Sequence, residues 1–590
     1  MINTILLVTT IWLSAGCDDP NKINNNQPDK TKIHTIYELN QETHELDSHA
    51  GEERSSTLEL DYNSFVEIPK SVLGVSTPVY SRIKKKKNGG YLLTYQDAQI
   101  GTNIYVSHSL DLSVWTQGNL LFEKKNITSS KGADTKRYSS ADAVVLSNGD
   151  ILVAASFRAN LAYRYSPETN GIAIRRSKDN GTTWGTEQII YVGTNWEPYL
   201  LELPSGQIHC YFTDTDPTYS NSGTSMIVSD DGGLTWSPTG TSKNYKVVRQ
   251  YKYLNQGQRI YTDQMPVVRM LNDGVTLAGF MEARLETDDQ PDGTSYFMMS
   301  LVYGKSNWEY LTGDAVGPID RQTNLFRGAG GYIEQFPSGE TVISCNISNK
   351  FSMKVGDSQA RNFNHNSWST DWLQPFNSSG YWGSLEVDNT HSIIGTIHKS
   401  DAIVLGRFIL NHRINAQIKD IILNGKSDEW THTDALFIGS ESTTQATFRA
   451  AFDAKNLYIL AERRDKYVND GDIIELYIHN NRTNTLNDNS LKIVIDWSGI
   501  TTCYKWSKNQ WKESSLPCAD AVNTVSGIAN DINSDNGYLS EIMISLSDIN
   551  PIDDYIRFNA VLVDGSVTDT FSFADTQKPD TWMLIKKQNK

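Results

Sequence analysis

The sequence has few cysteines and fewer basic than acidic residues. Its 590 residues include five Cys, and 69 Asp and Glu outnumber 53 Lys and Arg, for a formal net charge of −16. This charge argues against nucleic acid and anionic membrane surfaces as partners. Beyond the first residues, no apolar run is long enough to span a membrane. The His residues lack zinc-ligand spacing, and no phosphate-binding glycine loop or dinucleotide motif is present.

The chain begins with an apolar run that ends in small residues before a cysteine. In MINTILLVTTIWLSAGCDD the apolar part is too short to cross a bilayer as a mature helix. The stretch LSAGC, residues 13–17, resembles a bacterial lipoprotein signal. The resemblance implies a signal peptide over 1–16, cleavage before Cys17 and lipidation of its sulfur. An ordinary secretory signal is the alternative, since no Lys or Arg precedes the run.

Residues 17–56 are expected to form a disordered tether. The segment DDPNKINNNQPDKTK is polar and Asn-rich, and it cannot bury enough apolar surface to fold. Acidic residues directly after Cys17 resemble the surface-export signals of some Gram-negative lipoproteins. We therefore expect a monomer in the cell envelope, lipid-anchored to the outer membrane and exposed at the cell surface. Its membrane contact would be through the anchor alone.

One unit recurs six times: an apolar strand, a tight turn and a second apolar strand. Asn-Gly and Asp-Gly turns are strong hairpin signals because Gly and Asn tolerate positive φ. The spacing leaves room for a four-stranded blade and its loops, so the repeats predict a six-bladed β-propeller. The turns are Asn88-Gly89, Asn148-Gly149, Ser205-Gly206, Asp273-Gly274, Ser338-Gly339 and Asn389-Thr390.

A second repeat lies within the first. SKDNGTTW (177–184) and SDDGGLTW (229–236) share the pattern Ser-x-Asp-x-Gly-x-x-Trp, and SLDLSVW (109–115) is a shorter relative. These segments resemble the Asp-boxes of sialidase-type propellers. The Asp side chain is expected to bind backbone N–H groups of the turn, and the Trp to fill the space between strands. Their role is structural.

The length predicts more than one domain, and composition favours an all-β protein. We place the propeller over 57–415 and a β-sandwich over 416–590. In the second region, strands of alternating polar and apolar residues continue, but their spacing differs from that of the blade repeat. The opening Asn424-Gly425 and Asp428-Glu429-Trp430 give this second part a resemblance to the family 9 carbohydrate-binding modules.

The second domain contains further candidate features. Cys503 and Cys518 could pair in an oxidising exterior, whereas Cys210 and Cys345 are expected to be buried thiols. The aromatic residues of CYKWSKNQW (503–511) form either a sugar-binding platform or an amphipathic hairpin with its Trp in the core, and the sequence leaves both open. No cofactor is expected to be required. Asp470 and Asp472 are candidate ligands of a structural Ca²⁺, although such pairs are more often solvated.

Two glutamates at strand ends are the candidate catalytic pair. Glu197 begins an inner strand beside Trp196, and Glu282 ends a strand of the next blade after Phe280-Met281. The ends of inner strands converge on one face of a propeller. A carboxyl group against apolar walls has a raised pKa, and glycoside hydrolysis uses one protonated and one ionised carboxyl. The sequence therefore predicts a glycosidase.

The motifs YSRI, NWEPYLLELPSGQ, DQMPVVRMLNDG, VGDSQARNF and YWGSLEV are similar to landmarks of glycoside hydrolase family 93. This resemblance implies a retaining exo-enzyme that releases arabinobiose from plant α-1,5-L-arabinan. It implies catalytic roles for Glu197 and Glu282, with Glu197 favoured as acid/base and Glu282 as nucleophile. The candidate substrate-binding residues at the strand ends are Arg82, Asp142, Arg158, Trp196, Asp263, Arg327 and Trp382.

Three other functions stay open. One is another exo-glycosidase on the same scaffold. A sialidase would clamp a carboxylate with an arginine triad, for which Arg82, Arg158 and Arg327 are available. Against it, YWGSL places Trp382 where a sialidase has its nucleophilic Tyr. The third function, of a different class, is a non-catalytic surface lipoprotein that binds glycans, but two acids within apolar walls are not typical of sugar binding.

Overall fold

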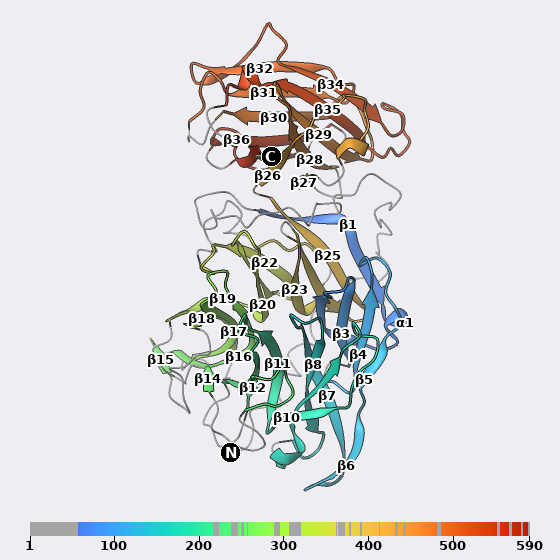
Figure 1. Ribbon diagram of the computed structural model, residues 1–590, viewed down its shortest axis with the longest axis vertical. Coiled ribbons are helices and arrows are strands. Elements are labelled where there is room, and N and C mark those ends of the chain that lie inside the picture. The colour runs from blue at the N-terminus through green and yellow to red at the C-terminus, as the bar shows by residue number, and fades with distance from the viewer. Residues whose placement is uncertain are drawn as a thin grey trace.

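The computed structural model consists of two β-rich domains stacked end to end (Figure 1). No helix among its described residues is both long and apolar enough to cross a membrane. The signal segment, the tether and Cys17 lie outside these residues. The structure describes residues 57–98, 100–163, 165–215, 223–237, 246–248, 253–255, 258–287, 295–305, 320–361, 363, 372–376, 379–389, 392–411, 413–430, 433, 435–439, 444–480, 485–551, 555–565, 569–579 and 582–587.

The first domain is a closed ring of six antiparallel sheets, numbered here as blades one to six. The innermost strands β2, β7, β11, β16, β20 and β23 contact one another in that order, and β23 contacts β2. The N-terminal strand β1 pairs with β25 and so completes blade six, which closes the ring. Six radial sheets around one axis form the predicted six-bladed β-propeller.

The blades differ in strand number from the predicted uniform four. Blades two and four have five strands, and the described part of blade five has three. Their bounds are β2 (Pro78–Lys85), β3 (Tyr91–Asp97), β4 (Ile104–Ser109), β5 (Asn119–Phe122); β6 (Lys125–Ser129), β7 (Gly132–Val145), β8 (Ile151–Ala159), β9 (Gly171–Ser177), β10 (Gln188–Val192); β11 (Asn195–Glu202), β12 (Ile208–Asp214), β13 (Gly223–Ser229), β14 (Lys246–Val248); β15 (Tyr253–Asn255), β16 (Gln258–Met270), β17 (Thr276–Thr287), β18 (Ser295–Lys305), β19 (Asp320–Arg327); β20 (Ala329–Gln335), β21 (Thr341–Ile347), β22 (Lys350–Gly356); and β1 (Thr57–Pro69), β23 (Tyr381–Asn389), β24 (Ser392–Lys399), β25 (Ala402–Asn411). Two short helices are α1 (Lys70–Leu73) and the 3₁₀ helix η3 (Pro167–Thr169).

Five of the six predicted hairpin turns lie between the first and second strand of their blade, and the sixth, Asn389-Thr390, extends beyond the described residues. Gly149 and Gly206 have φ of 93° and 85°, which their turns require and which a side chain would oppose. The turns of the two segments with the pattern Ser-x-Asp-x-Gly-x-x-Trp, 177–184 and 229–236, also form as predicted. The Asp179 carboxylate accepts from the main-chain N–H of Thr183 at 2.8 Å, and Asp231 accepts from that of Thr235 at 2.8 Å.

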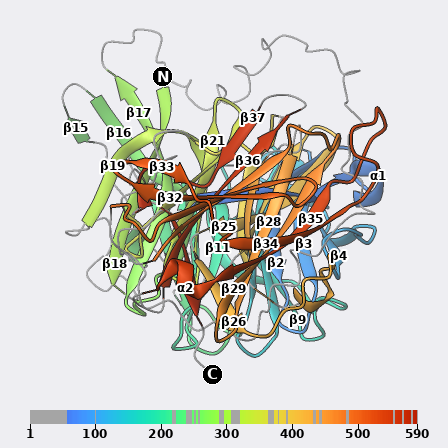
Figure 2. The ribbon, with the colours of Figure 1, turned by 90° about the horizontal axis from the view of Figure 1, so that it is seen from above.

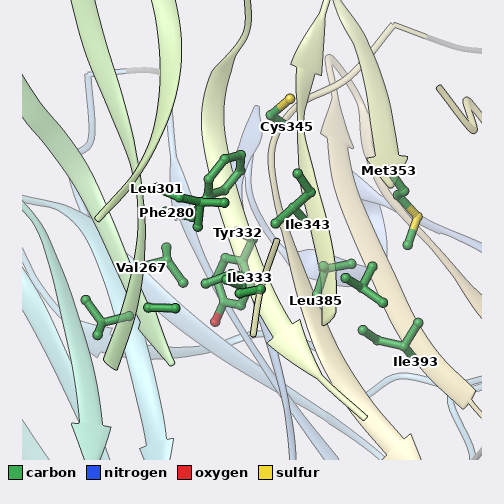
Figure 3. Close-up of a cluster of buried hydrophobic side chains, with 14 of the residues drawn as sticks. Val267, Phe280, Leu301, Tyr332, Ile333, Ile343, Cys345, Met353, Leu385 and Ile393 are labelled. Carbon is green, nitrogen blue, oxygen red and sulfur yellow. The ribbon is translucent and has the colours of Figure 1, made fainter. Parts of the chain in front are cut away.

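Apolar side chains of adjacent blades pack into a continuous core. In Figure 3, Val267 and Phe280 of blade four face Tyr332 and Ile343 of blade five, and all four are buried. Leu385 of blade six continues the same cluster. This packing fixes the angle between blades, and therefore the position of each inner strand at the central axis.

The second domain is a β-sandwich whose two sheets share β26. This strand pairs in parallel with β38 in one sheet and with β28 in the other. Its bounds are β26 (Arg413–Ile418), β27 (Ala435–Gly439), β28 (Thr444–Phe452), β29 (Asn456–Asp465), β30 (Ile473–His479), β31 (Leu491–Asp496), β32 (Thr501–Ser507), β33 (Gln510–Glu513), β34 (Ala519–Val525), β35 (Tyr538–Ser545), β36 (Tyr555–Asp564), β37 (Asp569–Ser572) and β38 (Met583–Lys587), with η5 (Asp428–Trp430) and α2 (Leu546–Ile549). The sandwich therefore starts at Arg413 rather than at 416.

The two domains meet where β25 leads into β26, and Figure 2 shows the sandwich lying over the propeller. The Asn411 side chain accepts from the main-chain N–H of Phe437 at 2.8 Å and donates to its carbonyl at 2.5 Å. Phe437 also packs with Ala435 against Ile409 of β25. The junction is thus a packed contact that includes paired polar groups.

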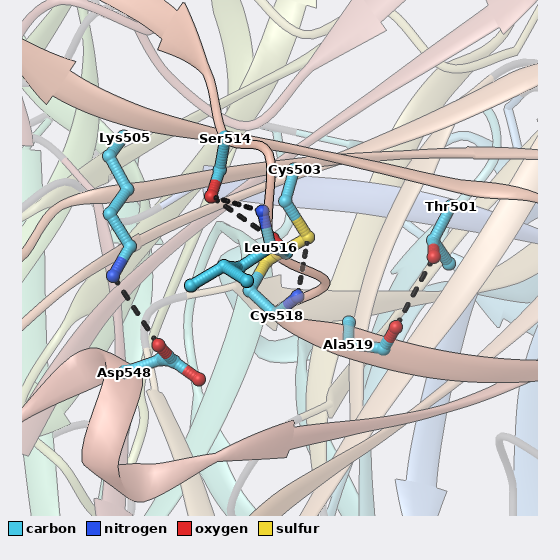
Figure 4. The surroundings of a disulfide bond; sticks show 8 residues. All are labelled: Thr501, Cys503, Lys505, Ser514, Leu516, Cys518, Ala519 and Asp548. Carbon is cyan, nitrogen blue, oxygen red and sulfur yellow. Dashed lines mark hydrogen bonds and ion pairs between the residues drawn. A yellow bond between two sulfur atoms is a disulfide. The ribbon is translucent and has the colours of Figure 1, made fainter.

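Within the sandwich, the sulfurs of Cys503 and Cys518 are bonded at 2.12 Å (Figure 4). This bridge joins β32 to the start of β34. Cys210 and Cys345 are buried free thiols in the propeller, as expected.

Candidate functional site

Each inner strand of the propeller has a β-bulge at the same level. At each bulge the strand pairing shifts register, and the first bulge residue has positive φ. Positive φ strains a side chain with a Cβ, and bulges of this kind gather at barrel rims and active sites. The six residues are Tyr80 (59°), Ser140 (52°), Glu197 (52°), Met265 (46°), Gly330 (63°) and Trp382 (44°).

Most of these bulges are bound to the preceding blade by the same hydrogen bond. The donor is the main-chain N–H of the bulge residue. The acceptor is a side chain on the second strand of the preceding blade, and this residue pairs with the inner-strand residue that comes directly before the bulge of that preceding blade. In blade two the equivalent residue, Ser156, donates instead to Asn195 Oδ1 at 2.8 Å. The bonds run from the N–H of Ser140 to Gln96 (2.6 Å), Met265 to Thr213 (2.9 Å), Gly330 to Glu282 (2.9 Å), Trp382 to Asn346 (3.0 Å) and Tyr80 to His398 (3.3 Å).

Glu197 is the bulge residue of blade three. The Thr213 hydroxyl donates to Glu197 Oε2 at 2.6 Å and accepts from the Met265 N–H, so its proton is directed at the carboxylate. Burial raises the pKa of Glu197 to about 7, against the lowering effects of the Thr213 bond and of Arg158 and Arg82. A carboxyl group with this pKa is poised to change its charge near neutral pH.

Glu282, on β17 of blade four, is 6% exposed. Burial raises its pKa to about 8, the Gly330 N–H lowers it, and the negative charge of Glu197 raises it. The two glutamates are therefore near enough for one charge to affect the other. Both have raised pKa values, whereas glycoside hydrolysis was expected to use one protonated and one ionised carboxyl group.

A small cavity at the bulge ring opens to solvent; the empty space around it, part of which is open solvent, is about 230 Å³. Its wall includes side chains of blades one to four and main chain of blade five. The lining residues are Tyr80, Arg82, Asp142, Glu197, Pro198, Tyr199, Met265, Pro266, Val267 and Gly331.

Arg82 and Arg158 are held by the protein in different ways. Arg82 Nη1 donates to the carbonyls of Ser81, Trp382 and Gly383 at 2.9, 2.7 and 3.1 Å. It therefore ties blade one to blade six while its residue lines the cavity. The Arg158 guanidinium lies 3.4 Å from the ring centroid of Trp196 and donates to the Ile100 carbonyl at 2.6 Å.

The remaining predicted substrate residues differ in position. Trp382 lies beside Tyr80, with ring centroids 6.1 Å apart. Asp263 is fully buried. Arg327, expected near the start of the inner strand of blade five, is the last residue of β19 in blade four, where it pairs with Met298 and is exposed. The inner strand β20 begins two residues later, at Ala329.

A charged layer beneath the cavity was not predicted. Lys84 Nζ donates to the Tyr332 hydroxyl at 3.0 Å and to Glu386 Oε2 at 3.2 Å, while Arg269 pairs with Glu334 at 3.3 Å. These residues alternate with apolar ones along the inner strands, as in Arg82-Ile83-Lys84. The period-two pattern of polar residues within apolar strands was the available signal.

In the sandwich, the two Trp side chains of the segment 503–511 lie partly exposed beside buried aromatic residues. Trp506 and Trp511 are partly exposed, with ring centroids 5.2 Å apart, and Trp511 contacts Tyr477 at 5.6 Å. Tyr477 in turn packs on Trp582, which is 1% exposed and part of the core.

Asp470 and Asp472 do not face a common site. Asp470 accepts from Trp497 and Asn530, whereas Asp472 accepts from Arg463 at 3.1 Å. Oxygens of Asp465, Asp472 and Asp564 lie within 4.8 Å of one another, and Arg463 also pairs with Asp465 at 2.6 Å. The guanidinium already supplies the compensating charge, so these side chains fit an ion-pair network better than a Ca²⁺ site.

Comparison with known proteins separates the two domains. Residues 419–578 match the family model described as "Carbohydrate family 9 binding domain-like". A sialidase of Micromonospora viridifaciens is 33% identical over 114 residues, which are 16% of this chain. The aligned part spans 17% of the length of that sialidase.

Several solved structures resemble parts of the chain. The Penicillium chrysogenum α-L-arabinanase complexed with arabinobiose is 17% identical with a TM-score of 0.40, covering 60% of this chain and 98% of its own. The family 93 α-L-arabinofuranosidase of Fusarium graminearum is 16% identical with a TM-score of 0.42, covering 58% and 97%. A family 9 carbohydrate-binding module of Caldicellulosiruptor kristjanssonii is 18% identical with a TM-score of 0.24, covering 30% and 94%. At these identities and TM-scores the likenesses carry no information on substrate.

Proposed function

We propose that the protein is a retaining exo-glycosidase that releases arabinobiose from the ends of plant α-1,5-L-arabinan. The observation that carries the hydrolase assignment is the electrostatically coupled pair Glu197 and Glu282 at the bulge ring, with pKa values of about 7 and about 8. Two carboxyl groups that change charge near neutral pH suit acid/base and nucleophilic roles at one glycosidic bond. The motif resemblance to family 93 supports the choice of arabinan.

The surroundings of the two glutamates favour opposite roles to those first expected. Glu197 accepts a hydroxyl hydrogen bond and is stabilised by two guanidinium groups, so it ionises first. Glu282 has one main-chain donor and is disfavoured as an anion by the charge of Glu197. We therefore assign Glu197 as nucleophile and Glu282 as general acid.

The reaction then has two steps. Glu197 attacks the anomeric carbon while Glu282 gives its proton to the leaving oxygen, so the glycosidic bond breaks as the bond to Glu197 forms. Glu282, now ionised, takes a proton from water, whose oxygen attacks the anomeric carbon and releases Glu197. Two inversions give net retention, a course that requires the two carboxyl groups to lie about 5–5.5 Å apart. A cavity in a closed ring of strands suits a chain end rather than a chain interior.

The first test is product analysis on linear debranched arabinan, with p-nitrophenyl arabinofuranoside and sialoside beside it. The wild-type protein is expected to release arabinobiose alone, and Glu197→Gln and Glu282→Gln to lose that activity. Release of sialic acid instead would support the alternative that the 33% identity to a sialidase favours. Binding without release would favour a glycan-binding lipoprotein.

We also propose that a lipid on Cys17, outside the described residues, anchors the enzyme to the outer membrane. Metabolic labelling with a fatty acid is expected to mark the wild-type protein in the outer-membrane fraction. Cys17→Ser should remain unlabelled, and labelling of that variant would rule the anchor out.

A further inference from the structure

The floor of the cavity contains a carboxylate with one oxygen left without a partner. Asp142, on β7, is 1% exposed and lines the cavity. Its Oδ2 accepts from the main-chain N–H of Leu200 at 3.0 Å. Its Oδ1 is buried and has no hydrogen-bond partner among the described residues. Leaving such an atom unpaired costs about 1–3 kcal/mol. Asp142 is the one residue among those with such atoms in the described part of the chain that also lines the cavity, so a ligand hydroxyl can reach its Oδ1 there.

Burial and the surrounding groups act in opposite directions on this carboxyl group. Burial raises the pKa of Asp142 above its ordinary value, and Lys84, the Leu200 N–H, Arg82 and the Ala143 N–H offset only part of that effect. Lys84 is fixed from the opposite side of the ring, since its ammonium group donates to Tyr332 of blade five and Glu386 of blade six. Asp142 is therefore held by the main-chain N–H of Leu200 in blade three and interacts electrostatically with the ammonium group of Lys84 in blade one.

A carboxylate on the substrate would meet unfavourable surroundings at this floor. Asp142 and Glu197 both line the cavity and both carry negative charge when ionised. Arg82 Nη1 is already bound to three main-chain carbonyls. Arg158 is stacked on Trp196. Arg158 Nη1 is buried without a partner among the described residues, but of the three candidate arginines only Arg82 lines the cavity. The three-arginine clamp that binds the carboxylate of an anionic sugar is therefore not gathered there.

We infer that Asp142 determines the class of the terminal sugar: its Oδ1 accepts a hydroxyl of a neutral glycosyl unit, and the two acidic side chains Asp142 and Glu197 at the cavity disfavour a unit carrying a carboxylate. This inference rests on the proposed glycosidase function and adds to it the chemistry that the deepest part of the site selects.

The test compares Asp142→Asn with wild type on a panel of p-nitrophenyl glycosides. The neutral members carry α-L-arabinobiose, α-L-arabinofuranose, β-D-xylose and β-D-galactose, and the acidic members carry β-D-glucuronic acid and sialic acid. The amide oxygen of Asn can still accept from Leu200, so the fold is expected to persist. Asp388→Asn is the matched control, because Asp388 is a buried carboxylate that accepts from Tyr91 at 2.7 Å and does not line this cavity.

The wild-type protein should turn over neutral members only. Asp142→Asn should lower kcat/KM for the best neutral glycoside about 10- to 100-fold, as expected for one hydrogen bond to a charged acceptor. Asp388→Asn, if folded by circular dichroism, should change it less than about twofold. Asp142→Ser serves as a second, uncharged variant and should behave like Asp142→Asn.

The outcomes separate this inference from the arabinan proposal. Turnover of another neutral glycoside but not arabinobioside, with the same dependence on Asp142, would end the arabinan assignment and leave the inference standing. A folded Asp142→Asn within about twofold of wild type would overturn it. So would preferred turnover of an acidic member, or no turnover of any neutral member.

Discussion

The main-chain N–H of Gly330 donates to Glu282 Oε2 across 2.9 Å, joining the second strand of blade four to the bulge of blade five. Glutamine, threonine, asparagine and histidine side chains make the corresponding bond elsewhere in the ring. Glu282 thus occupies a position whose general role is structural. Its acidity is what distinguishes it from these other side chains.

This double role makes a prediction about two substitutions. Glu282→Gln keeps an oxygen that can accept from Gly330 but loses the proton donor, so kcat should fall about 10²- to 10⁴-fold. Its melting temperature should barely differ from that of wild type at pH 4.5, where Glu282 of the folded wild-type protein is protonated. Glu282→Ala loses both, and its free energy of unfolding should fall by about 1–3 kcal/mol because the N–H loses its partner. Steady-state kinetics and thermal denaturation measure the two effects. If Glu282→Gln keeps a tenth of the activity, Glu282 is a structural residue only.

The pH dependence of kcat/KM should be bell-shaped. Glu197 must be ionised, so activity should rise through a pKa of about 7, and Glu282 must be protonated, so activity should fall above about 8. Because the charges interact, these values belong to the pair. The profile is measured on arabinan oligosaccharides in buffers of constant ionic strength. An optimum below pH 5 would contradict the assigned environments.

Thr213 should control the acid limb of that profile. Thr213→Val removes the hydroxyl donor to Glu197, so the pKa of Glu197 should rise and the limb should move to higher pH. Each unit of movement lowers kcat/KM about tenfold at a pH below the limb. Thr94→Val is the matched control, since the buried Thr94 hydroxyl has no partner among the described residues. Equal profiles for the two variants would show that Thr213 does not act on Glu197.

The six blades could be predicted from the sequence, but the ring of β-bulges on the inner strands could not. Turns such as Asn148-Gly149 are local signals, because backbone conformation alone favours them. The bulge at Glu197 is different, since its Thr213 contact joins strands and the Met265 bond comes from the next blade. The charged layer around Lys84 depends likewise on side chains from blades five and six. Pairings between distant segments cannot be read from local pattern.

Buried acids should also make stability depend on pH. A carboxyl group with a raised pKa binds its proton more tightly in the folded than in the unfolded protein. The stability that Glu282 contributes is thus present below about pH 4.5 and lost as pH rises through about 8. Glu282→Gln has no such loss and should gain stability relative to wild type between pH 5 and 9, as measured by urea denaturation.

Glu187 provides the control of opposite sign. Burial alone would raise the pKa of Glu187, but hydrogen bonds and ion pairs with Lys136 and Lys125 lower it to about 2. Glu187→Gln should therefore lose stability relative to wild type across the same pH range. A Glu282→Gln curve that runs parallel to wild type would mean that Glu282 is not buried as an acid.

The disulfide should stabilise the sandwich without affecting catalysis. Cys503 and Cys518 are 15 residues apart, and closing a loop of this length contributes about 3 kcal/mol. The double variant Cys503→Ser, Cys518→Ser should therefore lower the calorimetric transition of the sandwich, and dithiothreitol should do the same to wild type. Hydrolysis of soluble arabinan oligosaccharides should be unchanged, because both glutamates lie in the propeller. A Cys210→Ser variant controls for loss of a thiol, since Cys210 is buried and unbridged. Loss of hydrolysis in the double variant would mean that the sandwich supports the active site through the contact between Asn411 and Phe437.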